Sequence, residues 1–227
     1  MIISKQKPLS EILELLKGAS LVSIIGCGTC ATHCRTGGEG EVREMGVRLR
    51  ECQKSLIEEF VIESVCASEK TKKELKKRKT SLQRCDALLV MACGVGAQVV
   101  AAMIVKPVYP ALDTLFIGSW RAHGPYEEMC SLCGDCLLGL TGGICPITRC
   151  SKGLMNGPCG GAREGRCEVD PQRDCGWLLI YERLKAQGNL EFLEKMWGPC
   201  DFSKSGHPQR VPSSRSSRLK AQSSKDK

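Results

Sequence analysis

Aromatic residues are scarce in this 227-residue chain, at 4% of the total, and there are only three histidines. No apolar run approaches the ~20 residues that a bilayer-spanning helix needs, so we expect no membrane span. The first twenty residues lack the basic start, the long apolar centre and the small-residue cleavage site of a secretory signal. We therefore expect a cytoplasmic protein, whose thiols stay reduced.

Positive charge is concentrated in two places. Residues 203–227 carry seven Lys or Arg against one Asp, a net +6 that leaves about +2 of the total +8 for the rest. A second basic run, residues 70–84, has helical spacing and fits a solvated surface helix or a docking face for an acidic partner. Neither run contains aromatic residues that could stack on bases, so we expect no nucleic-acid partner. We expect residues 203–227 to form a basic, disordered tail.

Residues 1–118 alternate between helical and extended patterns. Such alternation predicts an α/β domain with a small parallel sheet and packed helices. Its turns at the carboxyl ends of strands are where such sheets build their sites. The expected helices are residues 9–16, 42–56, 70–84 and 94–103, and the expected extended segments are residues 21–25, 60–65, 87–91 and 108–117.

Cysteine is the residue in excess, with 16 in the chain. Residues 130–175 contain eight of them among Gly and Pro, with little periodicity. A segment of this kind buries little apolar surface, so we expect residues 119–202 to form a metal-held, cysteine-rich domain. Short helices are expected at residues 177–185 and 190–197.

The first cysteine group has the spacing C-x2-C-x3-C, directly after the strand at residues 21–25. Three such thiolates could hold three corners of an iron–sulfur cubane, and a cysteine after a neighbouring strand could supply the fourth ligand. A structural zinc or a redox-active disulfide are the alternatives. The candidate ligands are Cys27, Cys30, Cys34 and Cys93.

The second group begins with C-x2-C-x2-C, the spacing of bacterial ferredoxins. Either Cys145 or Cys150 could close this cubane, or the fourth ligand could belong to a second cluster. The remaining set of four would be Cys150, Cys159, Cys167 and Cys175. Sequence does not assign the grouping, and zinc could occupy one of the two sites. We expect two or three [4Fe-4S] clusters in total. The candidate ligands are Cys130, Cys133, Cys136, Cys145, Cys150, Cys159, Cys167 and Cys175.

Four cysteines, Cys52, Cys66, Cys85 and Cys200, have no partner at ligand spacing and are expected to be structural. No Ser/His/Asp arrangement or paired-carboxylate motif is present, so we expect no catalytic residues of this chain's own. Clusters of this kind carry single electrons, which predicts an electron carrier between a donor and a catalytic partner.

The stretch from CSLCGDC to CGWLLIYERL resembles the cysteine-rich domain associated with methylenetetrahydrofolate reductases. With GCGTCATHC, MACGVGAQ and PVYPALDTLFIG before it, residues 1–203 resemble the small iron–sulfur subunits of the two-subunit reductases of acetogenic bacteria. The resemblance implies an electron-transfer role in the methyl branch of the acetyl-CoA pathway of one-carbon metabolism.

The resemblance also implies partners. A separate flavin subunit, with FMN, would reduce methylenetetrahydrofolate to methyltetrahydrofolate with electrons from this chain, and a further subunit would supply the electrons. A zinc-stabilised scaffold that assembles the same complex is the alternative.

Overall fold

The computed structural model describes residues 1–120 and 124–211 of the chain. It divides into two compact units, of which the first is residues 1–129 and the second begins at Cys130. The sequence pattern places the boundary between residues 118 and 119. Residues 212–227, most of the expected disordered tail, lie outside the described residues.

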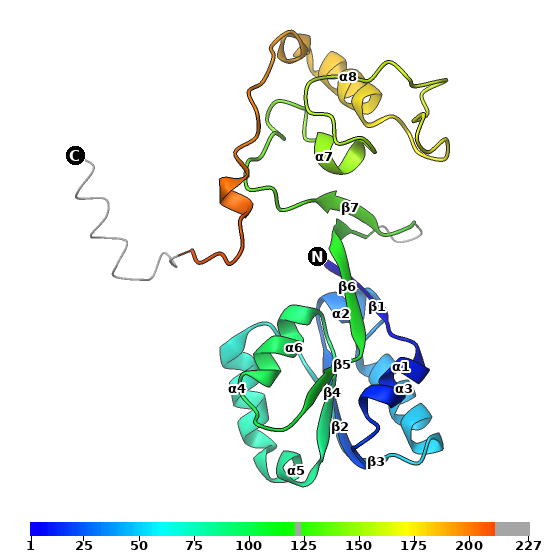
Figure 1. The fold of residues 1–227 in the computed structure, drawn as a ribbon, viewed down its shortest axis with the longest axis vertical. Coiled ribbons are helices and arrows are strands. Elements are labelled where there is room, and N and C mark those ends of the chain that lie inside the picture. Colours follow the sequence, from blue (N-terminus) through cyan, green and yellow to red (C-terminus); the bar gives the residue numbers. More distant parts are fainter. Residues whose placement is uncertain (121–123, 212–227) are drawn as a thin grey trace, which may run out of the picture. The chain divides into compact units, whose positions relative to one another are not determined.

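The first unit contains a four-stranded parallel sheet in the order β3-β2-β4-β5 (Figure 1). Its central strands are apolar because both faces are covered: all five residues of β4 are buried. This sheet confirms the α/β expectation for the first part of the chain. The strands are β2 (Leu21–Cys27), β3 (Ser55–Ile62), β4 (Ala87–Met91) and β5 (Val108–Pro110).

Helices cover both faces of this sheet, with α1 and α3 on one side and α4, α5 and α6 on the other (Figure 1). The core between them includes Ile24, Leu49 and Leu89, each fully buried. The turn of α2 (Cys30–His33) follows β2. The other helices are α1 (Leu9–Leu15), α3 (Glu39–Glu51), α4 (Ser68–Lys77), α5 (Lys79–Arg84) and α6 (Gly94–Ala101).

Two predicted helices differ from the observed ones. The helix expected over residues 42–56 ends at Glu51, because Gln53 has a positive φ of 62° and β3 starts at Ser55. The basic helix expected over residues 70–84 is divided at Arg78 into α4 and α5. The Arg78 side chain lies over the Phe60 ring and pairs with Glu58, which anchors the break to β3.

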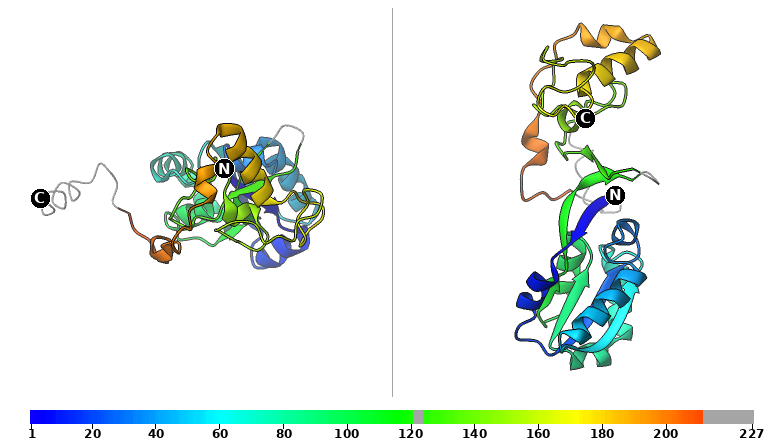
Figure 2. Two further views of the ribbon diagram at one scale, coloured as in Figure 1. Left: turned by 90° about the horizontal axis from the view of Figure 1, so that it is seen from above. Right: turned by 90° about the vertical axis from the view of Figure 1, so that its right-hand side faces the viewer.

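A second sheet has the order β1-β6-β7, and Figure 2 shows two further views of its strands. β1 (Ile2–Gln6), which the pattern did not predict, pairs antiparallel with β6 (Leu112–Ser119). The extended segment expected over residues 108–117 therefore divides between two sheets, since β5 belongs to the parallel one. β7 spans Glu127–Cys130.

The second unit has little regular structure besides α7 (Pro146–Arg149) and α8 (Gly176–Gln187). The expected helix at residues 190–197 is a 3-10 turn, η1 (Leu190–Leu193), and a second turn, η2 (Phe202–Ser205), includes the first residues of the expected tail. Along α8, which the sequence predicts as a helix over residues 177–185, Trp177, Ile180 and Leu184 form a small buried apolar cluster.

Among the residues described, no helix combines the length and the apolar character that crossing a bilayer requires.

Candidate metal centres

The thiols of the first triplet lie on one turn at the carboxyl end of β2. Cys27 is the last residue of β2, Cys30 is the first residue of α2, and Cys34 is its C-cap. Cys27 and Cys34 are buried, and Cys30 is half-buried. The backbone of Ile2 in β1 contacts two of these thiols: its N–H donates to Cys30 Sγ at 3.4 Å, and its carbonyl accepts from Cys34 Sγ at 3.6 Å. β1 therefore lies over the turn that presents the triplet.

Cys93 follows the neighbouring strand. It is the N-cap of α6, two residues after the end of β4, and it is half-buried. β2 and β4 pair in parallel, with Gly26 opposite Met91, so Cys27 and Cys93 leave the same edge of the sheet. Gly37 contributes to this arrangement because a Cβ there would lie 2.1 Å from the Met91 carbonyl oxygen. The fold thus brings the turn after β2 against the end of β4.

Four cysteines of the second unit line one small cavity of about 20 Å³. Two of them flank helices, since Cys150 is the C-cap of α7 and Cys175 is the N-cap of α8. The other two, Cys159 and Cys167, lie in the loop between these helices. The structure thereby gathers Cys150, Cys159, Cys167 and Cys175, which the sequence offers as one of the possible sets of four.

Charged and polar groups surround this cavity. Lys152 forms an ion pair with Glu168, and the Cys159 thiol donates to Glu168 Oε1 at 3.1 Å. Lys152, followed by the Cys159 thiol, lowers the pKa of Glu168. A hydrogen bond between Cys167 and Ser151 is the largest of the interactions that lower the pKa of Cys167. A lowered thiol pKa favours the thiolate, which is the form that binds metal.

The other thiols of this unit lie around α7 and the loop before it. Cys130 ends β7, Cys133 and Cys136 lie in the following loop, and Cys145 is the N-cap of α7. The Cys133 thiol donates to the Asp135 carbonyl at 3.5 Å. Burial is the largest cause of a raised pKa at Cys200, a residue that the sequence predicted to be structural, and Asp135, Cys133 and Cys145 raise this pKa further.

Within residues 1–120 and 124–211, no group of three or more His, Cys, Asp or Glu side chains is arranged to hold a metal ion. In the domain that was expected to be held by metal, the structure therefore brings thiols near one another without arranging them as metal ligands. The donor chemistry still fits a thiolate-bound metal, because four cysteines line one cavity. Metal binding would require these side chains to turn inward, as is usual where a site forms on binding.

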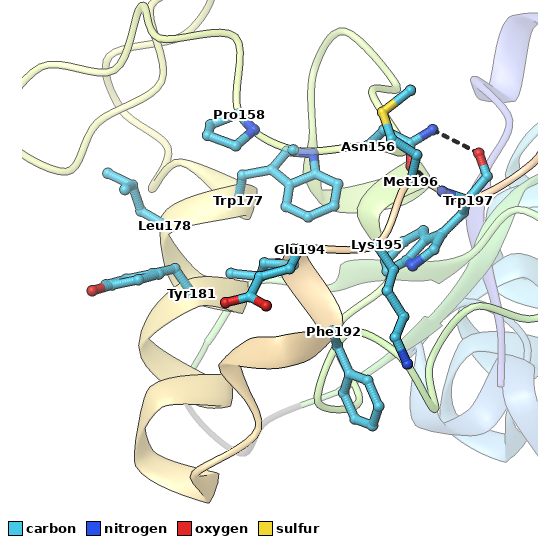
Figure 3. Close-up of a pocket in the computed structure, with 12 residues that line it drawn as sticks. Asn156, Pro158, Trp177, Leu178, Tyr181, Phe192, Glu194, Lys195, Met196 and Trp197 are labelled. Carbon is cyan, nitrogen blue, oxygen red and sulfur yellow. Dashed lines mark hydrogen bonds between the residues drawn. The ribbon is translucent and has the colours of Figure 1, made fainter.

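A larger pocket of about 380 Å³ lies beside the four-cysteine cavity in the second unit. Figure 3 shows its lining from α8, η1 and the segment after η1, including Tyr181, Phe192 and Trp197. Asn156 fixes Trp197 through two hydrogen bonds, accepting from its N–H at 2.8 Å and donating to its carbonyl at 3.1 Å. Trp177 lines both the pocket and the four-cysteine cavity.

Comparison of the chain with curated proteins and with solved structures gave no match. Residues 109–203 match a protein-family model described as "Methylene-tetrahydrofolate reductase C terminal". The matched segment includes the end of β5, all of β6, and the cysteine-rich second unit as far as η2. Residues 109–203, fewer than half of the chain, are therefore similar to the methylenetetrahydrofolate reductase C-terminal family.

Proposed function

We propose that this chain is the electron-transfer subunit of a methylenetetrahydrofolate reductase complex. The observation that carries the proposal is the family match over residues 109–203, a segment that contains nine of the sixteen cysteines. A segment so rich in thiols, with no accompanying acid–base apparatus, is suited to holding redox metal rather than to converting a substrate itself.

The thiols divide among three neighbourhoods, which serve as the proposed centres. The first is the edge of the parallel sheet at Cys27, Cys30, Cys34 and Cys93. The second is the C-x2-C-x2-C loop with Cys145, and the third is the four-cysteine cavity. An iron–sulfur cluster supplies one-electron transfer when it is bound. The chain's own groups hold it and tune it: the Ile2 N–H, for example, points at Cys30 Sγ, and such hydrogen bonds to sulfur influence potential.

The proposed electron acceptor is a flavin subunit that carries FMN and reduces methylenetetrahydrofolate to methyltetrahydrofolate. A further subunit would supply the electrons, in the cytoplasm and within the methyl branch of the acetyl-CoA pathway. This chain would hold neither folate nor flavin. Its contribution would be to position metal centres between donor and acceptor.

The test is anaerobic purification followed by analysis of iron, zinc and acid-labile sulfide. We expect a brown protein with roughly four iron atoms and four sulfides per cluster, in two or three clusters. The dithionite-reduced chain, freed of excess reductant, should then reduce the flavin of the partner subunit in a stopped-flow experiment. A colourless protein that holds zinc alone would falsify the electron-transfer proposal.

A zinc-stabilised scaffold is the second candidate, and the four-cysteine cavity is the centre that supports it, because four thiolates are a usual ligand set of structural zinc. Zinc at this centre together with iron at the others would combine a structural and a redox role. Zinc at every centre would favour the scaffold.

A further inference from the structure

The outward side of α4 and α5 carries a concentrated positive charge. Residues 68–84, which form both helices, contain eight Lys or Arg against two Glu, a net +6. Outside this run and residues 203–227, the chain carries a net −4. The positive charge of the first unit therefore lies largely on a helix pair that covers one face of its parallel sheet (Figure 1).

The packing of the two helices turns these cations toward solvent. Thr71, Leu75 and Leu82 are buried, and the two leucines belong to the core of the first unit. The cations at the intervening positions lie on the outer side, and most of them are exposed. Five exposed cations make up what we name the basic face: Lys72, Lys73, Lys76, Lys79 and Arg84.

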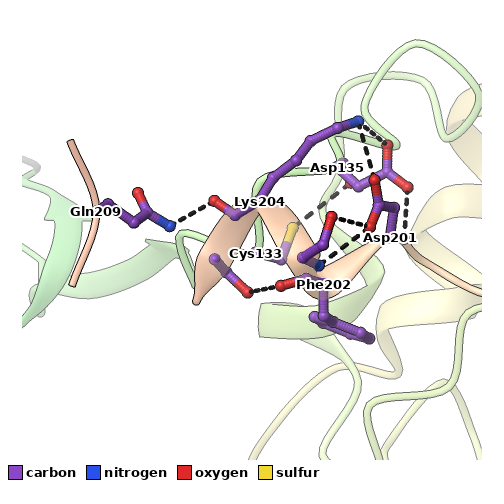
Figure 4. A network of polar contacts seen from close by, with 8 residues as sticks. Cys133, Asp135, Asp201, Phe202, Lys204 and Gln209 are labelled. Carbon is purple, nitrogen blue, oxygen red and sulfur yellow. Dashed lines mark hydrogen bonds and ion pairs between the residues drawn. The ribbon is translucent and has the colours of Figure 1, made fainter. Parts of the chain in front are cut away.

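The basic face differs from an ordinary solvated helix surface, on which charges of both signs pair. Among residues 1–120 and 124–211, its five cations form no ion pair. On α3, by contrast, each of the three arginines pairs with a glutamate. In the second unit, Lys204 lies 3.7 Å from Asp135 and 3.8 Å from Asp201 (Figure 4). The unpaired charge is therefore a property of this face and not of the chain in general.

The spacing of these lysines is unfavourable for the helix itself. Lys72 and Lys76 are four positions apart, and Lys73 and Lys76 are three apart, so like charges are neighbours on one side of α4. Such pairs destabilise a helix, and no carboxylate of the described residues compensates them. An anionic surface laid against the basic face would relieve this repulsion.

The basic face starts beside the first group of candidate ligands. Residues 63–67 connect β3 to α4, and they pack against both cysteine-bearing segments of the first unit. A Cβ at Gly28, inside the first triplet, would lie 3.1 Å from Glu63 Cα. A Cβ at Gly96, in the helix that Cys93 caps, would lie 3.2 Å from Val65 Cβ. A protein that docks along α4 can therefore reach the edge of the sheet at which these thiols lie.

The composition of the face favours a protein over a lipid or a nucleic acid. Residues 68–84, all of which the structure describes, expose no large apolar side chain that could insert into a bilayer. They contain no aromatic ring for stacking on bases, and four of the five cations are lysines, which lack the bidentate geometry of arginine. Surface carboxylates of a protein are the remaining anions.

We propose that the basic face docks an acidic protein, and that this protein is the electron donor of the centre at Cys27, Cys30, Cys34 and Cys93. The similarity to the reductase family is confined to residues 109–203, so the basic face lies outside the part that we associate with the flavin subunit. At each encounter the donor loses one electron and the centre gains it. The donor role rests on the proposed function, whereas docking rests on the charge alone.

Binding of a flavodoxin, a small acidic electron carrier, to the full-length chain tests the docking. Fluorescence anisotropy of the labelled chain gives the dissociation constant. Lys72→Gln/Lys73→Gln/Lys76→Gln should weaken binding about tenfold at low ionic strength, because it removes most of the attraction. The difference should disappear at about 1 M salt, where charges are screened over about 3 Å. Cytochrome c, a basic electron carrier, should not bind.

The matched control changes the net charge equally on the other side of the sheet. Lys17→Gln/Arg43→Gln/Arg48→Gln also removes three exposed cations, but from α3 and the end of α1, and should leave flavodoxin binding unchanged. Residues 203–227 are identical in both variants, so their positive charge contributes equally. The basic-face variant should resist urea at least as well as the wild type, because like charges are removed from α4. Weaker binding would then not be a consequence of unfolding.

Carbodiimide cross-linking shows where the flavodoxin binds, because this reagent joins a lysine directly to a carboxylate that it contacts. Mass spectrometry should find Lys72, Lys73 or Lys76 linked to aspartate or glutamate of the flavodoxin. Lys17 should remain unlinked. The reduced flavodoxin should also reduce the metal-loaded chain faster at low than at high ionic strength, and this dependence should weaken in the basic-face variant.

Three results would overturn the docking: equal loss of flavodoxin binding in the two triple variants, cross-links that avoid the basic face, or tight binding of cytochrome c. Phosphatidylserine vesicles or duplex DNA that bind more tightly than flavodoxin, and are released by the basic-face substitutions, would overturn a protein as the occupant. Flavodoxin that binds at the face without reducing any centre would overturn electron transfer and leave the docking. Equal reduction rates in wild type and basic-face variant would do the reverse.

Discussion

Single charges decide how favourable the four-cysteine cavity is for a metal. Four thiolates around a divalent ion carry excess negative charge, which Lys152 offsets and Glu168 increases, although both side chains are partly exposed and therefore screened. The two residues form one ion pair, yet they should influence the centre in opposite directions. Substitution of each in turn separates a charge effect from a packing effect.

Lys152→Met should lower the metal affinity of this centre about tenfold, because it removes the cation beside the thiolates. Glu168→Gln should raise the affinity, because it removes a negative charge. The measurement is competition with a chromophoric zinc chelator, and Lys152→Arg is the matched control. Affinity changes of the same sign in Lys152→Met and Glu168→Gln would show that the charges do not act on the metal. As a further control, neither change should appear in a Cys167→Ser background.

Asp86 makes a pH-dependent contribution to the stability of the first unit. Its Oδ2 accepts hydrogen bonds from the backbone N–H groups of Ser20 and Leu21, at 2.9 and 2.8 Å, and these bonds lower its pKa. A lowered folded-state pKa stabilises the protein above the unfolded value of about 3.9, and this contribution is lost as pH falls through the folded value.

Asp86→Asn should therefore weaken the start of β2 at pH 6 and have a smaller effect at pH 3. Hydrogen exchange of the backbone amides of Val22 to Ile25 is the measurement, since these residues lie directly after the anchored ones. The difference in protection between wild type and variant should shrink on acidification. A difference that is independent of pH would exclude the ionised carboxylate as its source.

At the scale of elements, glycine sets how closely the cysteine turn approaches the neighbouring strand. A Cβ at Gly37 would lie 2.1 Å from the Met91 carbonyl oxygen, and backbone cannot move aside as the end of a flexible side chain can. Gly37 also accepts the hydrogen bond from the Cys27 N–H at 2.9 Å. The turn with the first triplet thus depends on this contact.

Gly37→Ala should lower the free energy of unfolding of the first unit by about 1–3 kcal/mol, as overpacking typically does. Gly40→Ala is the control three residues later, because no atom lies within 4 Å of the added Cβ. Gly40 lies in α3, so this substitution should raise the free energy of unfolding by up to about 1 kcal/mol. Urea unfolding followed by circular dichroism measures both. Equal effects of the two substitutions would contradict a steric role for Gly37.

The sequence pattern predicts elements whose signal is local and misses those that need a distant partner. Residues 87–91 form β4 as expected because the run is uniformly apolar. β1 escaped prediction because two apolar residues carry little signal, and its pairing with Ile117 and Leu112 lies more than a hundred residues away. Leu56 happens to have the spacing of the apolar face of the helix before it. It lies in β3 instead, because the chain turns at Gln53.

The same limit applies to the candidate centres. Spacing identifies the triplets, because their thiols share one turn or loop. It leaves open whether Cys150 lies with Cys159, Cys167 and Cys175 or with the C-x2-C-x2-C group, since the loop between α7 and α8 decides this. The spacing also does not reveal that the segment after Cys200 contacts the C-x2-C-x2-C loop, where Asp201 bonds to Asp135 and Lys204 lies against Gly134.

At the scale of the whole molecule, the two units differ in what stabilises their folds. The first has an extensive apolar core on both faces of its parallel sheet, whereas the fully buried apolar residues of the second are few and lie along α8. Loops with exposed backbone join its cysteines. We expect metal to supply the stability that this small core does not provide.

Removal of metal should therefore make the second unit sensitive to protease while the first stays resistant. Anaerobic chelation followed by brief trypsin treatment should cut at Arg163, Arg166 and Arg173, which are exposed in the loop before α8. The lysines of α4 serve as an internal control, because they are equally exposed but lie in a helix that packs on the first unit's core. Mass spectrometry of the fragments gives the order of cleavage. Two results would show that metal does not hold the second unit together. One is cleavage in α4 as early as in the loop, and the other is equal resistance of the loop to trypsin with and without metal.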